Sequence, residues 1–282
     1  MPTNAELTEQ QKQQWTAVAE GWECWTDWLE NSARDITAWL GDHAGAQPGS
    51  RLLDLACGGG EPAATLAARV APGGDVVAAD ISPEMVGVTR RRAERLGRAN
   101  LTAQVADLQT LPFDDASFDG VTCRFGLMFC PEPELAAREI RRVLRPGGRF
   151  AAAVWDLPAK NPFFIVLAEV LGRHMELPAP DPRAPGLFRL APPGEFEGIL
   201  RGAGLEDVLV ESRPMIWAYD SPEEYWKIQL DLAAPLRAAI RALPADSVDR
   251  LRADVLESLH PFTENGQVRL TATALCGSGR KA

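Results

Sequence analysis

Residues 51–62, Arg-Leu-Leu-Asp-Leu-Ala-Cys-Gly-Gly-Gly-Glu-Pro, decide the fold that we predict for this chain. Three leucines in the first half are typical of a short buried strand, and three consecutive glycines follow them. Pro62 suits the start of a helix, and an apolar run continues over residues 63–70. Glycine lets a backbone approach a ligand closely, and a helix N-terminus offers free N–H groups. The stretch therefore predicts a ligand site at a strand–turn–helix corner.

Two classes of ligand fit this corner. The glycine spacing over residues 58–63 fits the dinucleotide fingerprint, and Asp80 fits its ribose-binding acid. Asp54 and Glu61, however, place two carboxylates where a pyrophosphate would bind, and they would repel it. The same carboxylates suit a ligand with an ammonium group, a sulfonium and two ribose hydroxyls, which is S-adenosylmethionine. A tight turn that binds nothing is the remaining interpretation.

Composition narrows the class of protein. With 282 residues, 46% of them hydrophobic, the chain can form one large α/β domain or a domain with a cap. A net charge of −10 disfavours nucleic acid, and the arginines at 90–92 and 138–145 are interpreted as solvated helix faces. No stretch reaches the ~18 apolar residues of a membrane span. Residues 1–14 lack a signal-peptide core, and the five cysteines show no C-x-x-C spacing. We therefore expect a cytoplasmic protein without a membrane partner or a bound metal.

Strand and helix patterns alternate after residue 51, which predicts a parallel sheet with right-handed crossovers. Strands are predicted at 52–55, 75–79, 101–105, 118–123, 149–155, 205–213 and 267–276, and helices at 62–71, 83–97, 131–144, 163–175, 193–202, 221–241 and 245–259. Residues 5–42 carry five tryptophans and are expected to form a pair of helices. The tryptophans are interpreted as a core-facing stripe, as a lid over a small-molecule site, or as a dimer contact.

A family resemblance appears along residues 50–156. Five ordered motifs carry it: Leu-Asp-Leu-Ala-Cys-Gly-Gly-Gly (53–60), Ala-Asp-Ile-Ser-Pro-Glu-Met (79–85), Ala-Asp-Leu-Gln-Thr-Leu-Pro-Phe (106–113), Ser-Phe-Asp-Gly-Val-Thr-Cys-Arg-Phe (117–125) and Glu-Ile-Arg-Arg-Val-Leu-Arg-Pro-Gly-Gly-Arg-Phe (139–150). The set resembles the class I S-adenosylmethionine-dependent methyltransferases, in particular the small-molecule branch with the ubiquinone/menaquinone-biosynthesis and natural-product enzymes. Ala56 departs from the pattern, because the family usually has a glycine there. We expect a small local adjustment and retained binding.

The resemblance implies a fold and a division of the chain. The expected fold is α/β, a Rossmann-like doubly wound sheet of seven strands, mostly parallel with an antiparallel edge strand. N-terminal helices and a mainly helical cap complete it. We expect an N-terminal helical lid at 1–45 and an S-adenosylmethionine-binding core at 46–156. Cap and substrate-binding insertions with a late sheet strand are expected at 157–260, and a C-terminal edge strand at 261–282.

The resemblance also assigns roles to residues. The backbone at Ala56, Cys57 and Gly58 is expected to face the methionine part of the cofactor, and Asp80 to accept hydrogen bonds from both ribose hydroxyls. Ile81 and Met85 are expected to pack on the adenine, with Asp107 accepting from its amino group and Leu108 closing the pocket. Arg124 and Phe125 are expected near the methyl donor, at the carboxyl end of a strand. The full set of expected cofactor contacts is Trp15, Asp54, Ala56, Cys57, Gly58, Gly60, Asp80, Ile81, Met85, Asp107, Leu108, Arg124 and Phe125.

A general base is needed only when the methyl acceptor is a poor nucleophile. The candidates are His174, which follows the predicted cap helix, and His260, which precedes Pro261. His43, Tyr219 and Asp156 are further options, and each of these residues also has a purely structural interpretation.

The predicted function is therefore S-adenosylmethionine-dependent methyl transfer (EC 2.1.1 type) to a small molecule, such as a secondary metabolite or quinone-like compound. The alternative is a protein with this fold that binds the cofactor but catalyses a cyclisation or isomerisation, or only binds. A nicotinamide dehydrogenase is disfavoured, because the Glu61 carboxylate would repel the pyrophosphate of its cofactor. A homodimer remains open.

Overall fold

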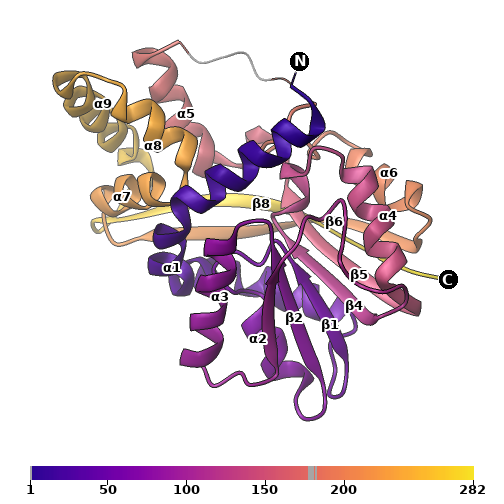
Figure 1. Ribbon diagram of the computed structural model, residues 1–282. Helices are drawn as coiled ribbons and strands as arrows, with labels where there is room; N and C mark the ends of the chain where they lie inside the picture. Colours follow the sequence, from indigo (N-terminus) through magenta and orange to yellow (C-terminus); the bar gives the residue numbers. More distant parts are fainter. Residues whose placement is uncertain (1, 177–180, 182) are drawn as a thin grey trace.

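The computed structural model describes residues 2–176, 181 and 183–282. The elements alternate as expected (Figure 1). Their bounds are α1 Asn4–His43, β1 Arg51–Leu55, α2 Ala63–Val70, β2 Asp75–Asp80, α3 Pro83–Arg95, β3 Leu101–Val105, β4 Phe118–Arg124, η1 Leu127–Phe129, α4 Pro133–Val143, β5 Leu144–Trp155, η2 Pro158–Lys160, α5 Pro162–His174, α6 Glu195–Gly202, β6 Glu206–Tyr219, α7 Pro222–Leu232, α8 Ala234–Arg241, α9 Ala245–Ser258, η3 His260–Phe262, β7 Thr263–Glu264 and β8 Gln267–Arg280.

One mixed sheet forms the centre of the molecule. The strand order is β3-β2-β1-β4-β5-β8-β6, and the short β7 pairs with β8. Strands β1 to β5 are parallel, whereas β8 is antiparallel to both β5 and β6. The predicted Rossmann-like α/β sheet is confirmed. The antiparallel strand lies one place inside the edge, however, because β6 and not the C-terminal strand β8 occupies the edge.

The two faces of the sheet have separate cores, because consecutive strand residues point to opposite sides. Leu52 of β1 lies in a buried cluster with Leu66 of α2 and Val86 of α3. Its neighbour Leu53 lies in the larger cluster, together with Ile140 of α4. Covering both faces with helices explains why the parallel strands read as nearly continuous apolar runs.

The N-terminal region is one continuous helix, α1, and not the predicted pair. Thr3 is the N-cap: its hydroxyl accepts from the Glu6 N–H, while the Glu6 carboxylate accepts from the Thr3 N–H. This reciprocal arrangement is a capping box. At about 1.5 Å per residue, a helix of 40 residues is long enough to reach both the sheet and the cap.

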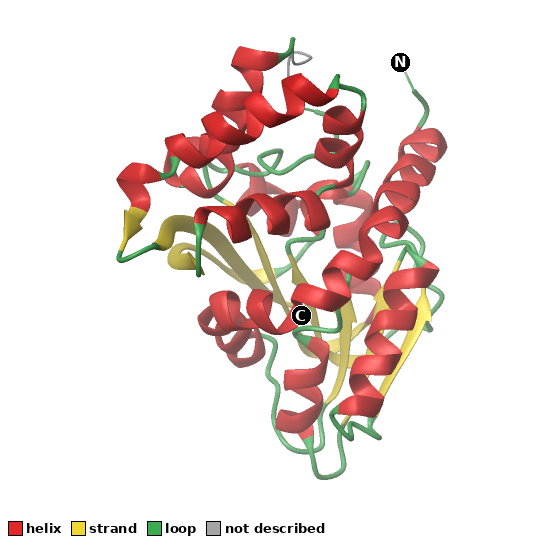
Figure 2. Cartoon of the chain, turned by 90° about the vertical axis from the view of Figure 1, so that its left-hand side faces the viewer, coloured by secondary structure: helices red, strands yellow, loops and turns green. Residues whose placement is uncertain are grey.

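Helices α5, α7, α8 and α9 form a cap at one end of the sheet, as Figures 1 and 2 show. The predicted helix 221–241 is divided into α7 and α8, because Pro235 lies in the first turn of α8 and cannot continue the preceding helix. Helix α6 and strand β6 come from the same part of the sequence but pack in the sheet layers. None of the described helices is long and apolar enough to cross a membrane.

Candidate functional site

The glycine turn after β1 is built from left-handed backbone. Ala56, Gly58 and Gly60 have φ angles of 54°, 49° and 95°. Ala56 is the residue that replaces the expected glycine, and its methyl group is accommodated by Gly126, where any added Cβ would collide with the Ala56 Cβ. No local sequence pattern marks Gly126 as the partner of this substitution.

Asp80 and the glycine turn meet at the carboxyl ends of neighbouring strands. One carboxylate oxygen of Asp80 accepts from the Gly58 N–H at 3.0 Å, and the other accepts from the Ser82 N–H at 3.0 Å. Ser82 also caps α3 by accepting from the Met85 N–H. Burial raises the pKa of the Asp80 carboxyl, and its backbone hydrogen bonds oppose that rise. The structure therefore fixes this acid beside the turn.

Asp54 is fully buried one strand position before the turn. Its Oδ1 accepts from the Thr122 hydroxyl at 2.7 Å, but its Oδ2 has no hydrogen-bond partner among the described residues. Burial raises the pKa of the Asp54 carboxyl to about 7, while the hydrogen bond from Thr122 lowers it. An orphaned buried carboxylate oxygen suits the ammonium group of S-adenosylmethionine.

The expected adenine contacts line the same end of the sheet. Met85 is buried in a small cluster with Val18 and Ala19 of α1, against which Trp15 and Trp22 pack. Asp107 accepts from the Gln109 backbone N–H at 2.9 Å. Of the other expected contacts, Leu108 and Cys57 are buried and Ile81 is partly exposed. Trp15 therefore comes close to Met85, as a shared role requires.

Arg124 points toward α1 and holds it. Its guanidinium donates to the Glu30 carboxylate at 2.6 Å, to the Thr37 hydroxyl at 2.7 Å and to the Glu61 backbone carbonyl at 3.2 Å. Phe125 follows with a φ of 61°, and its ring stacks on Trp155 with centroids 4.0 Å apart. The end of β4 therefore anchors a helix on one side and an aromatic cluster on the other.

Helix α1 covers the glycine turn, and a lid is one of the interpretations that its tryptophans allow. A Cβ added at Gly58 would lie 3.3 Å from the Trp22 ring, and one added at Gly59 would clash with the Thr26 side chain. The available signal was the acidic spacing of Glu23, Asp27 and Glu30 along one helix face. Each of these acids pairs with an arginine of α3 or β4.

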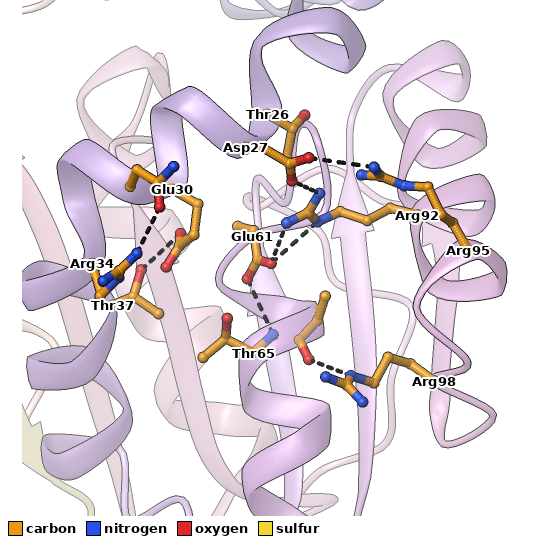
Figure 3. A network of polar contacts seen from close by, with 12 residues as sticks. Thr26, Asp27, Glu30, Arg34, Thr37, Glu61, Thr65, Arg92, Arg95 and Arg98 are labelled. Carbon is orange, nitrogen blue, oxygen red and sulfur yellow. Dashed lines mark hydrogen bonds and ion pairs between the residues drawn. The ribbon is translucent and has the colours of Figure 1, made fainter. Parts of the chain in front are cut away.

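Arg92 is the centre of the polar network between α1, the turn and α3 (Figure 3). It donates to the Glu61 carboxylate at 2.7 and 3.1 Å and to Asp27 at 2.7 Å, and Glu61 also accepts from the Thr65 N–H. Arg92 and Glu61 are 7% and 4% exposed at their side chains. The interpretation of arginines 90–92 as a solvated face is therefore wrong for Arg92, and Glu61 is not a free carboxylate.

The proposed bases lie elsewhere. His174 Nε2 is 2.6 Å from Asp254 Oδ2 between α5 and α9, and His260 is exposed in η3. Both belong to the cap and not to the glycine turn (Figure 1). Tyr219 is buried, and its hydroxyl accepts from the Gln229 amide at 3.4 Å. The structure does not bring either histidine to the turn.

Of the other two options, Asp156 binds Lys160 and Ser212, and the His43 ring stacks on Trp39.

Comparison with known proteins finds similarity to methyltransferases. Residues 53–152 match the family model described as "Methyltransferase domain". The demethylmenaquinone methyltransferase of Thermus thermophilus is 43% identical over 41% of this chain and 52% of its own length. The ubiquinone/menaquinone biosynthesis C-methyltransferase of Ectopseudomonas mendocina is 42% identical over 42% of this chain and 46% of its own length. The chain thus spans about half the length of these curated relatives.

Two solved structures show the same fold along most of the chain. The YcgJ protein from Bacillus subtilis superposes with a TM-score of 0.57 at 20% identity, over 88% of this chain and 98% of that one. The [4+2]-cyclase SpnF superposes with a TM-score of 0.55 at 20% identity, over 94% of both chains. The likeness to these two structures concerns the fold alone.

Proposed function

We propose that this chain is a class I S-adenosylmethionine-dependent methyltransferase that transfers the cofactor's methyl group to a small-molecule acceptor, because residues 53–152 match the family model of a methyltransferase domain. The acceptor is a secondary metabolite or a quinone-like compound. The names of the curated relatives, which act on demethylmenaquinone, support the second class. The observation that carries the proposal is the 3.0 Å contact between Asp80 and the Gly58 N–H, because it joins the acid of β2 to the turn of β1.

The residues around the turn fit the cofactor. Asp80 would accept from the ribose hydroxyls, and the orphaned oxygen of Asp54 would take the ammonium group. Met85 and Asp107 would hold the adenine. Because the Trp22 ring lies over Gly58, the N-terminal half of α1 would shift as the cofactor enters. Trp15 moves with it, so that α1 acts as a lid.

Alignment supplies most of the proposed catalysis. The bound cofactor supplies a methyl group on a strongly activated leaving group, and the protein must orient the acceptor and exclude water. Holding two reactants in line can account for roughly 7–11 kcal/mol of the barrier. The cap at 157–260 and the lid at 1–45 would choose the acceptor. His174 and His260 remain candidate bases only if the cap brings them to the acceptor.

The second candidate function within the same fold is cofactor binding coupled to a cyclisation or isomerisation. The [4+2]-cyclase SpnF shares the fold over 94% of both chains, and this favours keeping the alternative. Mass spectrometry of the product separates the two. Methyl transfer adds the mass of one methylene group, and a rearrangement leaves the mass unchanged.

Calorimetric titration with S-adenosylhomocysteine tests the proposal without a known acceptor. We expect micromolar affinity for the intact chain and a loss of at least about ten-fold in Asp80→Ala, because one carboxylate serves two hydroxyls. Asp75→Ala is the matched control, since Asp75 begins the same strand and its side chain pairs with Arg51 at 3.6 Å, outside the glycine turn. Equal affinities of the three proteins, or no binding by the unaltered chain, would refute the proposal.

A further inference from the structure

Aromatic side chains gather where strands β4, β5 and β6 end. Phe125 follows β4, Trp155 ends β5, and Trp217 lies two residues before the end of β6. Strand β6 runs in the same direction as β5, because both are antiparallel to β8. The three rings therefore lie at the carboxyl edge of the sheet, on the β4 side of the point where the strand order reverses. Ligands of open α/β sheets bind at this edge.

The rings form a layered cluster, which we call the aromatic cluster. Phe125 stacks on Trp155 at 4.0 Å with an interplanar angle of 9°, and Trp217 stacks on Phe163 at 4.9 Å and 25°. Trp28 of α1 lies 4.8 Å from Trp217. The lid helix, the sheet and the cap helix α5 thus each contribute a ring. A flat ligand held here would lie beside α1, the helix that also covers the glycine turn.

The indole N–H of Trp217 sets this cluster apart from an ordinary core. Its side chain is buried at 3% exposure, yet its Nε1 has no hydrogen-bond partner within the described part of the chain. Four tryptophans of α1, by contrast, donate to a protein oxygen: Trp22 to Leu232, Trp25 to Asp231, Trp28 to Ala218 and Trp39 to Glu211. A buried donor without an acceptor is costly, and such groups call for an explanation.

The backbone of Phe125 gives a second, independent indication of a ligand site. Its φ of 61° lies in the left-handed region, which a bulky residue rarely adopts, and its side chain is only partly buried. Backbone strain of this kind persists where the surrounding structure enforces it, and it concentrates at ligand sites. Both signs come from the same cluster, one at its partly exposed side and one in its interior.

We propose that the aromatic cluster binds the methyl acceptor, and that the acceptor is a flat conjugated ring whose oxygen accepts a hydrogen bond from Trp217 Nε1. This inference rests on the proposed methyl transfer and on the expectation that the methyl donor lies beside Arg124 and Phe125. Stacked rings favour a flat partner over a saturated one.

The charges around the cluster indicate a neutral acceptor. Arg124, the cation next to Phe125, is already bound by Glu30 and two further oxygens. Tyr219 packs against Trp28 and Phe163, and burial keeps its hydroxyl protonated by raising its pKa. Among the described residues, Trp217 therefore offers the acceptor's oxygen a buried donor that no protein atom occupies.

Three simple probes test the proposal on the full chain saturated with S-adenosylhomocysteine. Coumarin is flat and has a carbonyl oxygen, naphthalene is flat without one, and 1-decalone has a carbonyl on a saturated frame. Titration calorimetry is expected to show coumarin binding more tightly than the other two. Trp217→Phe keeps a ring but removes the N–H, so coumarin should bind about five-fold more weakly while naphthalene is unaffected.

Trp39→Phe is the matched control. It removes an indole N–H that donates to Glu211 outside the aromatic cluster, and coumarin affinity should not change. Thermal melting, monitored by circular dichroism, verifies that both variants are folded. Equal coumarin affinity in the unaltered chain and Trp217→Phe, or equal loss of coumarin and naphthalene, would overturn the role of Trp217. Failure to bind S-adenosylhomocysteine would instead overturn the proposed function, so the two failures are distinguishable.

Discussion

At the scale of single residues, the two acids nearest the glycine turn were predictable and their partners were not. Asp54 is the last but one residue of the apolar strand β1 and Asp80 ends β2, a pattern that places a carboxyl at the ligand edge of a parallel sheet. The pairing of Glu61 with Arg92 spans 31 residues. Spacing cannot indicate such a pair, because an arginine in a basic run normally faces solvent.

The protonation of Asp54 should control cofactor affinity. Below its pKa of about 7 the buried carboxyl is neutral, and above that pH it is charged and attracts an ammonium group. We therefore expect S-adenosylhomocysteine to bind more tightly as the pH rises from about 6 to about 8. Calorimetry across this range measures the effect, and Asp54→Asn should remove the slope while Asp75→Asn keeps it. A flat profile in the unaltered chain would contradict this role.

The Asp54 carboxyl affects the stability of the fold in the opposite direction: its contribution falls as the pH rises. A raised native pKa means that the folded chain holds more protons than the unfolded chain between about pH 4 and pH 7. This group's contribution to the free energy of unfolding therefore declines as the pH rises through that window.

At the scale of elements, sequence patterns located most strands and helices to within a few residues, because apolar periodicity is a local property. They missed that α1 is continuous over Asn4–His43, where a pair of helices was expected. They offered a lid over the site as one interpretation of the tryptophans but not the contacts that form it, because contacts between distant elements leave little local signal. The acids of α1 form ion pairs with arginines of α3, and these pairs are apparent only once the two helices are placed side by side.

The junction of α1, α2 and α3 depends on Arg92. Arg92→Met should lower the free energy of unfolding by about 3–5 kcal/mol, because it leaves the buried Glu61 carboxylate without its cation. Chemical denaturation measures the change. Asp27→Asn is the control: Asp27 is 65% exposed at its side chain, so its loss should cost less than about 1 kcal/mol.

The double variant Glu61→Met/Arg92→Met should recover part of the loss, since it removes both charges. If Arg92→Met alone lowered the free energy of unfolding by less than Asp27→Asn does, the Glu61–Arg92 pair would not hold the junction.

At the scale of the whole molecule, α1 connects the cofactor-binding core to the cap. Its Trp22 and Trp25 donate to Leu232 and Asp231 of α7, while its acids pair with α3. Gly21 permits this close crossing, because a Cβ there would clash with the Asp231 carbonyl oxygen. The sequence indicated a cap, but it could not indicate which helix joins the cap to the core.

Gly21→Ala should therefore separate α1 from α7. We expect a loss of roughly 1–3 kcal/mol in the free energy of unfolding, since overpacking forces the backbone to shift. Hydrogen exchange should become faster in α7 more than in α2. Gly87→Ala is the control, because its new Cβ would meet only the Arg91 guanidinium at 3.4 Å. Unchanged exchange in α7 would show that the helices adjust without separating.

The position of β8 between β5 and β6 has a consequence for biosynthesis. Strand β6 has β8 as its neighbour in the sheet, and β8 is translated last among the strands. On the ribosome, the first five strands can assemble early. Strand β6 lacks its hydrogen-bonding partner until β8 has emerged as far as residue 280. Nascent chains arrested before β8 should therefore be the ones that chaperones hold.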